Sequence, residues 1–211
     1  MKALLYCTKG KPYLVKKEIN YIDTKRKEVK YLIGNKYAYD NWINGEIVAE
    51  CDYEVEEIKL NEYDDYNFSH YSFMYFETET LQEEELCKQS CLTADELDEY
   101  LDLYKYKKVY GYAIHIKNLH VFDKPRKLKE FKQKGEYQCS KSKCPYFDTE
   151  KCHYAGECLY EKIITKAPQN MMYVFDGDEK KVLISIHPEH LCKILNGEKT
   201  IEVRKTILKY M

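Results

Sequence analysis

The chain has 211 residues and a mass of 25.3 kDa, enough for one domain with insertions or for one domain and a small module. A hydrophobic content of 44% allows a core, but no apolar run approaches membrane-spanning length and no secretion leader is visible. These features argue against a membrane or secreted protein, so we expect a cytoplasmic protein without a membrane partner. The formal net charge of −2 does not by itself indicate a nucleic-acid binder.

Charge is distributed unevenly along the chain. Residues 46–65 carry nine acids against one lysine, whereas residues 124–145 carry eight bases against two acids. Residues 180–211 carry seven bases against three acids. This segregation predicts a polarised surface with one side that attracts phosphate, although solvated faces of ordinary elements would give the same counts.

The N-terminal third is predicted to contain two strands. The first covers residues 3–10 and ends at Gly10, and a long polar connection follows over residues 11–45. Its Trp42 is predicted to pack in the core rather than to stack on a ligand. The second strand covers residues 45–58, where acids alternate with the inward set Ile47, Ala49, Cys51, Tyr53 and Val55.

Helical signals dominate the middle of the chain. Residues 80–91 are compatible with a helix. Thr93 and Glu96 have the spacing of a capping box, which predicts the start of a second helix. The predicted buried stripe of that helix is Leu97, Tyr100 and Leu101.

The segment after the helices is predicted to be extended. Residues 107–122 indicate one long strand or two, and residues 123–125 a turn. Residues 125–131 then predict a short basic helix.

Four of the nine cysteines are clustered in a short polar segment. Such a segment cannot bury a core of its own, so a bound ion would supply the missing stabilisation. Four thiolates satisfy tetrahedral Zn²⁺ in a closed, structural site. Free thiols and a disulfide are the alternatives, and His153 is a possible substitute ligand. The predicted zinc ligands are Cys139, Cys144, Cys152 and Cys158.

The C-terminal segment predicts strand, helix and strand. Residues 182–186 alternate at period two, Pro188 suits the first turn of a helix, and Gly197 suits its end. In the last strand Glu202 and Arg204 share one face, because successive side chains alternate. A carboxylate and a guanidinium are therefore expected side by side, close to the lysine at position 199.

The pattern G-x-K-x-x-E-x-R at residues 197–204 resembles the signature of ASCH domains, which are PUA-like β-barrels associated with RNA and modified nucleosides. Residues 109–131 and 164–175 resemble the last barrel strands of a bacterial and prophage ASCH subgroup. The resemblance implies a PUA-like mixed β-barrel of about five or six strands with flanking helices. The signature positions are Gly197, Lys199, Glu202 and Arg204.

The order of the segments differs from that in the family. In the proteins that this chain resembles, the signature comes before a strand like residues 3–10, whereas here it lies at the end. Joining residues 207–211 to residues 2–7 would restore the usual order. We therefore expect a circular permutation with residues 176–181 as the new bridge, or else a fragment of a tandem array.

The domain boundaries follow from this order. The permuted domain is predicted to consist of residues 1–130 and 167–211. Residues 131–166 are predicted to be the cysteine-rich, zinc-supported insert.

The functional hypothesis is a polar cleft at the barrel rim. A signature cation would meet a phosphate or a base carbonyl, and the signature carboxylate would accept hydrogen bonds from a base amine. Aromatic side chains nearby would stack on the base. An exposed salt bridge on the rim is the structural alternative. The predicted ligand-binding residues are Lys199, Glu202, Arg204, Thr8, Tyr6, Tyr112 and His115.

The resemblance leaves the type of activity open. It implies a module that binds RNA, a nucleotide or a modified nucleoside, or a hydrolase of the N4-acetylcytidine amidohydrolase or ribonuclease type. For hydrolysis the catalytic candidates are Lys199 and Glu202, although the amidohydrolase type has a threonine at the second position. As a base, Lys199 would have to lose its charge near neutral pH. A phage-type protein that sequesters nucleotides is a third hypothesis.

Overall fold

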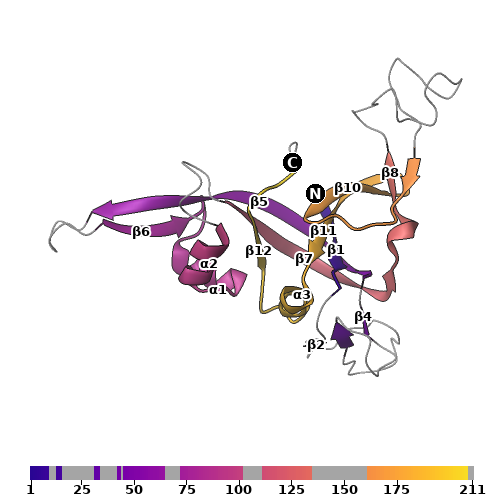
Figure 1. Ribbon diagram of the computed structural model, residues 1–211, viewed down its shortest axis with the longest axis horizontal. Coiled ribbons are helices and arrows are strands. Elements are labelled where there is room, and N and C mark those ends of the chain that lie inside the picture. Colours follow the sequence, from indigo (N-terminus) through magenta and orange to yellow (C-terminus); the bar gives the residue numbers. More distant parts are fainter. Residues whose placement is uncertain are drawn as a thin grey trace, which may run out of the picture.

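The computed structural model describes residues 1–9, 13–15, 31–33, 42–43, 45–64, 72–101, 111–134 and 161–208. These residues form a mixed α/β fold with a nine-stranded sheet, a three-stranded sheet and three α-helices. The strand order of the large sheet is β12-β7-β5-β1-β11-β10-β8-β9, and β6 pairs with the far part of β5 (Figure 1).

The elements have the following bounds. The large sheet contains β1 (Lys2–Cys7), β5 (Ile47–Asp64), β6 (Ser72–Glu77), β7 (Gly111–Arg126), β8 (Lys132–Lys134), β9 (Glu161–Ile163), β10 (Met171–Asp176), β11 (Glu179–Ile186) and β12 (Ile201–Arg204). The small sheet contains β2 (Tyr13–Val15), β3 (Tyr31–Ile33) and β4 (Trp42–Ile43). The helices are α1 (Glu83–Ser90), α2 (Ala94–Leu101), α3 (Pro188–Leu195) and the 3₁₀ helix η2 (Leu128–Glu130).

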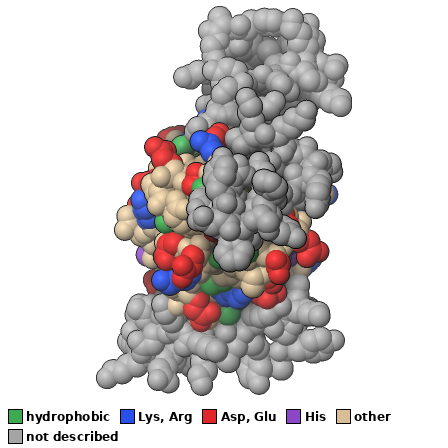
Figure 2. Space-filling model, turned by 90° about the vertical axis from the view of Figure 1, so that its left-hand side faces the viewer, with side chains coloured by type: hydrophobic (Ala, Val, Ile, Leu, Met, Phe, Trp, Pro, Cys, Tyr) green, Lys and Arg blue, Asp and Glu red, His purple; other side chains and the backbone are tan. Residues whose placement is uncertain are grey.

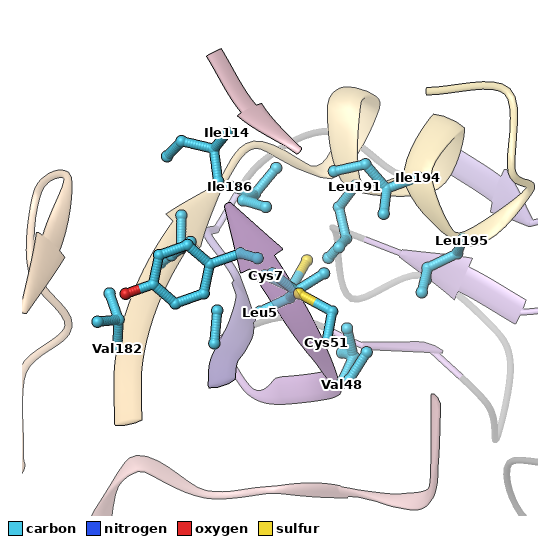
Figure 3. Close-up of a cluster of buried hydrophobic side chains, with 14 of the residues drawn as sticks. Leu5, Cys7, Val48, Cys51, Ile114, Val182, Ile186, Leu191, Ile194 and Leu195 are labelled. Atoms are coloured by element: carbon cyan, nitrogen blue, oxygen red, sulfur yellow. The ribbon is translucent and has the colours of Figure 1, made fainter. Parts of the chain in front are cut away.

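Strand β1 lies in the middle of the large sheet, parallel to β11 and antiparallel to β5. All its side chains from residue 3 to residue 7 are buried, as expected for an apolar strand covered on both faces. On one face Leu5 and Cys7 join a core that the apolar side of α3 covers (Figure 3). On the other face Leu4 and Tyr6 join a second core.

Strands β5 and β7 carry the sheet out into an arm. Beyond Ile58, β5 pairs with β6, and this part projects away from β8 and β10 (Figure 1). Helices α1 and α2 cover a third core here. The capping box is confirmed, because the Thr93 amide donates to Glu96 Oε2 at 2.8 Å and the Glu96 amide donates to Thr93 Oγ1 at 3.1 Å. The predicted stripe of α2 is wrong at Tyr100, which is 40% exposed.

The end of the molecule that carries α1 and α2 is acidic. The two helices contain seven carboxylates and one lysine. Acidic side chains are spread over the described part of this end in Figure 2. A phosphate backbone is repelled by such a surface, so this end is an unfavourable place for nucleic acid.

The described strand pairs do not close the large sheet into the predicted barrel, because β12 and β9 remain its two edges. Side-chain hydrogen bonds nevertheless connect the β12 end of the sheet with β11 and with the segment just before β10. Arg204 Nη2 donates to the carbonyl oxygen of Ser185 on β11 at 2.6 Å, and Asn170 Nδ2 donates to the carbonyl oxygen of Thr206 at 3.0 Å. The sheet therefore curls around the core that contains Leu5. Side-chain hydrogen bonds connect its β12 edge to β11, and no backbone hydrogen bonds between these two strands are described.

Other sequence predictions can be compared directly with the fold. The two ends of the predicted insert pair as β8 and β9, whereas its four cysteines lie outside the described residues. The side chain of Trp42 also lies outside them. Residues 111–126 form one long strand, and the short basic helix is reduced to η2. No helix within the described part of the chain has the length and apolar character needed to cross a membrane.

Candidate functional site

The signature begins where α3 ends. Pro188 occupies the first turn of α3, and the apolar face of the helix is buried in the core. Gly197 has a φ of 71°, in the left-handed region that favours glycine. The turn sends the chain back toward the helix, so that the Lys193 carbonyl oxygen accepts from the amides of Glu198 at 2.9 Å and Lys199 at 3.1 Å.

The end of α1 holds the same segment from the other side. The Thr200 amide donates to the Gln89 carbonyl oxygen at 2.9 Å, and Thr200 Oγ1 donates to Gln89 Oε1 at 3.2 Å. Cys91 Sγ donates to the Glu198 carbonyl oxygen at 3.3 Å. Lys199 is thus fixed between two helix ends before β12 begins.

Strand β12 divides its side chains between two faces, as predicted. Ile201 and Val203 are buried in the core under α1 and α2. Glu202 and Arg204 lie on the opposite face, where Glu202 is paired with Ile114 of β7. Since Ile114 belongs to the core around Leu5, the two charged side chains lie on the inner face of the curled sheet.

Lys199, Glu202 and Arg204 form one buried ion-pair network. Lys199 Nζ is 3.0 Å from Glu202 Oε2, and Arg204 Nη2 is 2.8 Å from Glu202 Oε1. Their side chains are 3%, 7% and 11% exposed, respectively. The salt bridge between Glu202 and Arg204 that the structural alternative predicts is present, but it is buried rather than exposed, and the same carboxylate also contacts Lys199.

The network has unused hydrogen-bonding capacity. Five buried side-chain polar atoms have no hydrogen-bond partner among the described residues, and three of them are Glu202 Oε2, Arg204 Nε and His190 Nδ1. Glu202 Oε2 has the Lys199 ammonium at 3.0 Å but accepts no hydrogen bond with normal directionality. Buried polar atoms are almost always satisfied by protein or water, so Arg204 Nε and His190 Nδ1 each have room for a further partner such as a water molecule or a ligand.

His190 is a site residue that the sequence reasoning missed. Burial and the Lys199 ammonium lower the pKa of His190, while the Glu202 carboxylate opposes this shift. The imidazole is therefore within electrostatic range of the network. No local pattern in the sequence pointed to it, because a histidine on an amphipathic helix is equally typical of a solvated position.

Tyr100 is a second residue that was not predicted as part of the site. The pKa of Tyr100 is raised, chiefly by burial. The Glu202 carboxylate adds to this shift, and the Arg204 guanidinium opposes it. Its ring lies 5.5 Å from Lys205 Nζ. An exposed aromatic ring therefore lies close to the charged network.

The remaining predicted ligand residues are divided between the two faces of the sheet. Tyr112 is paired with Arg204 across β7 and β12, so it shares the face of the network. His115 is paired with Ile201 on the opposite face, with Nε2 3.5 Å from Glu56 Oε1. Tyr6 is buried in the core on that opposite side of β1.

Thr8 lies just beyond the end of β1. Its Oγ1 is 3.3 Å from His187 Nδ1, at the start of α3. The structure thus brings together Lys199, Glu202 and Arg204 with Tyr112 alongside, and it separates His115 and Tyr6 from them.

No metal centre can be described. The predicted zinc ligands lie outside the described residues, and the described ones contain no group of three metal-ligating side chains. Cys7, Cys51 and Cys192 are buried in the core. Burial raises the pKa of both Cys7 and Cys51 to about 12.

Fold and site together define a mixed α/β protein whose curled sheet holds a buried, charged network at its edge strand. No family model, no curated protein and no solved structure matches the chain. The likeness to ASCH domains therefore depends on the signature and its neighbouring strands alone.

Proposed function

We propose that this protein binds RNA, a nucleotide or a modified nucleoside at the Lys199–Glu202–Arg204 network, as a permuted ASCH-type domain. The observation that carries the proposal is the convergence of the three signature side chains in one buried group. The sequence pattern selected these three residues before the structure was considered. Alternation along β12 predicts only a shared face for Glu202 and Arg204, so the burial of all three side chains together is an independent observation.

Energetics support a ligand rather than a purely structural role. A buried ion pair gains little over apolar packing, because desolvation of the charges offsets their attraction. Each buried polar atom left without a partner costs about 1–3 kcal/mol. This cost applies to the buried Arg204 Nε, so the network is an unfavourable way merely to join β12 to β11.

The finer fold assignment belongs to the same proposal. The contacts from Arg204 to Ser185 and from Asn170 to Thr206 support a PUA-like barrel that is completed by side chains at the β12 edge. The parallel pairing of β1 with β11 and the tight β10–β11 turn at Gly177 agree with a permuted order of segments. A zinc-supported insert remains part of the proposal, outside the described residues.

Binding is proposed ahead of hydrolysis for a chemical reason. Both oxygens of Glu202 face cations, and Glu202 occupies the position at which the amidohydrolase type has a threonine hydroxyl. The arrangement can recognise donor and acceptor groups of a base without supplying that hydroxyl.

Thermal-shift measurements with nucleosides, nucleotides and short single-stranded RNAs test the proposal. We expect stabilisation of the wild type and loss of the response in Lys199→Met and Glu202→Gln, which keep the shape of each side chain. Lys117→Met, at an exposed ion pair with Glu54, is the matched control and should respond like the wild type. An unchanged response in both site variants would remove the site, and product formation from a nucleoside or RNA would favour the hydrolase.

A further inference from the structure

Four exposed lysines gather at the end of the large sheet that carries η2, β8 and β9. Backbone hydrogen bonds hold these elements together, because β8 pairs with both β9 and β10 and the Ile164 amide donates to the Phe131 carbonyl oxygen at 3.1 Å. We call the four residues the basic patch. They are Lys124 near the end of β7, Lys129 in η2, Lys162 in β9 and Lys166 just after β9.

The charge of the basic patch is not neutralised within the described part of the chain. None of its four ammonium groups has a carboxylate partner among the described residues. Two carboxylates of the neighbouring elements are already bound, because Arg126 contacts Glu130 at 3.1 Å and Asp176 at 2.7 Å. Asp123 is the one exposed carboxylate without an ion pair among residues 111–130. The patch therefore keeps an excess of positive charge.

The opposite end of the molecule has the reverse balance. Helices α1 and α2 contain seven carboxylates, and their one lysine, Lys88, contacts Glu85 at 3.3 Å. Figure 1 shows these helices and β8 on opposite sides of the molecule along its longest axis. The uneven charge of the sequence thus becomes a separation in space, which attracts a polyanion to one end and repels it from the other.

We propose that the basic patch binds the sugar–phosphate backbone of a single-stranded RNA, one base of which occupies the Lys199–Glu202–Arg204 network. This inference rests on the proposed function and adds a second contact surface to it. Lysine suits this task, because an ammonium group contacts phosphate as a point charge and makes no demand on the base. Strand β12, which carries two residues of the network, lies between the acidic helices and β8 (Figure 1). The charge separation therefore directs an RNA from the network toward the patch.

The salt dependence of RNA binding tests the inference. Lysines that contact phosphate release counterions, so the slope of log K against log salt concentration is about −0.7 per contact for single strands. The double variant Lys129→Gln with Lys162→Gln should therefore make the slope for a ten-nucleotide RNA shallower by about 1.4. Fluorescence anisotropy with an end-labelled RNA of mixed sequence, in about 50 to 200 mM KCl, measures the slope. An unchanged slope would overturn the inference.

A matched double variant separates the patch from the net charge of the protein. Lys59→Gln with Lys88→Gln removes two exposed lysines from β5 and α1, outside the patch. It should keep the wild-type slope. A loss of slope equal to that of the patch variant would show that only the net charge matters, which contradicts the inference. Urea unfolding verifies that both double variants are folded, and their midpoints should match that of the wild type.

Glu202→Gln distinguishes failure of the inference from failure of the proposed function. It should weaken RNA binding and keep the wild-type slope, because the patch is intact. If the patch variant keeps the wild-type slope while Glu202→Gln binds weakly, the inference is overturned and the proposed function stands. If Glu202→Gln binds RNA as tightly as the wild type, both are overturned. A wild type that binds no RNA would overturn the inference, and the thermal-shift response to nucleosides would still decide the proposed function.

Discussion

Glu202 is the side chain that keeps two buried cations together. Removing its carboxylate in Glu202→Ala leaves Lys199 and Arg204 without a neutralising partner, which should destabilise the fold by about 3 kcal/mol or more. Urea unfolding measures this loss. Glu54→Ala removes a carboxylate from an exposed pair with Lys117 and should leave the unfolding midpoint unchanged. Equal midpoints for the two variants would mean that the network carries no buried charge.

A triple variant distinguishes a functional from a structural network. Lys199→Met, Glu202→Leu and Arg204→Met together replace the ions by apolar side chains of similar volume, which removes the desolvation cost along with the ion pairs. We expect this variant to be more stable than Glu202→Ala in urea and to show no ligand response in the thermal-shift screen. A triple variant that is less stable than Glu202→Ala would identify the network as a stabilising device.

At the scale of elements, Gly111 controls how closely β7, β12 and α2 approach one another. A Cβ at this position would lie 2.5 Å from Leu101 Cδ2 and 2.9 Å from the Arg204 carbonyl oxygen. Gly111→Ala must therefore move backbone as well as side chain, and overpacking of this kind costs about 1–3 kcal/mol. The unfolding midpoint in urea should fall accordingly.

A second glycine provides the control for this change. Gly177 has a φ of 62° in the β10–β11 turn, with open space around its Cα. Gly177→Asn should be tolerated, because asparagine adopts the left-handed conformation readily. If Gly111→Ala is as stable as Gly177→Asn, the close contact between β7 and β12 does not exist.

Much of the candidate site could be predicted because it is local in sequence. Pro188 and Gly197 mark the ends of α3, and alternation along β12 alone puts Glu202 and Arg204 on one face. The side chains of β1 and β7 that share this face with Glu202 and Arg204 are determined by the register between strands. Alternation within a single strand does not reveal that register. The pairing of β5 with β7 also contains two shifts of register. His115 and Tyr6 were therefore assigned to the wrong side of the sheet.

His190 and the open sheet illustrate the same limit. A single histidine on an amphipathic helix resembles any solvated residue, and the electrostatic influence of Lys199 and Glu202 on His190 arises only in the folded chain. Closure of a sheet depends on which edge strands pair with each other, and the pattern of a single strand does not predict that pairing. The capping box and α3 required no such information and were predicted correctly.

For the whole molecule, a second charged network joins β5, β7, β10 and β11. Arg126 binds both oxygens of Asp176, at 2.7 and 2.9 Å, and lies 4.3 Å from the Phe131 ring. The buried Lys181 ammonium contacts Asp176 at 3.2 Å and also Glu50. These bonds connect distant segments of chain, so they should contribute to the cooperativity of the fold.

This second network predicts how stability changes with acid. Hydrogen bonds from Arg126 lower the pKa of Asp176 below its ordinary value of 3.8, so their contribution is complete above that value and is lost as the pH falls through the folded-state pKa. Asp176→Asn should be less stable at neutral pH but should lose less stability between about pH 5 and pH 2. Urea midpoints measured across this range provide the comparison. Asp123→Asn, at an exposed site, should keep the wild-type slope, and an equally steep slope for Asp176→Asn would contradict the assignment.

The side-chain NMR signals of arginine test the central claim most directly, because the chain contains only three arginines and so only three Nε–H signals have to be assigned. A ten-nucleotide single-stranded RNA of mixed sequence, added to the ¹⁵N-labelled protein, should shift the Arg204 signal as its free Nε–H acquires a partner. The Arg126 signal should stay in place, because its Nε already donates to Glu130 at 3.1 Å. An Arg204 signal that does not move while RNA binds would show that the ligand site lies elsewhere.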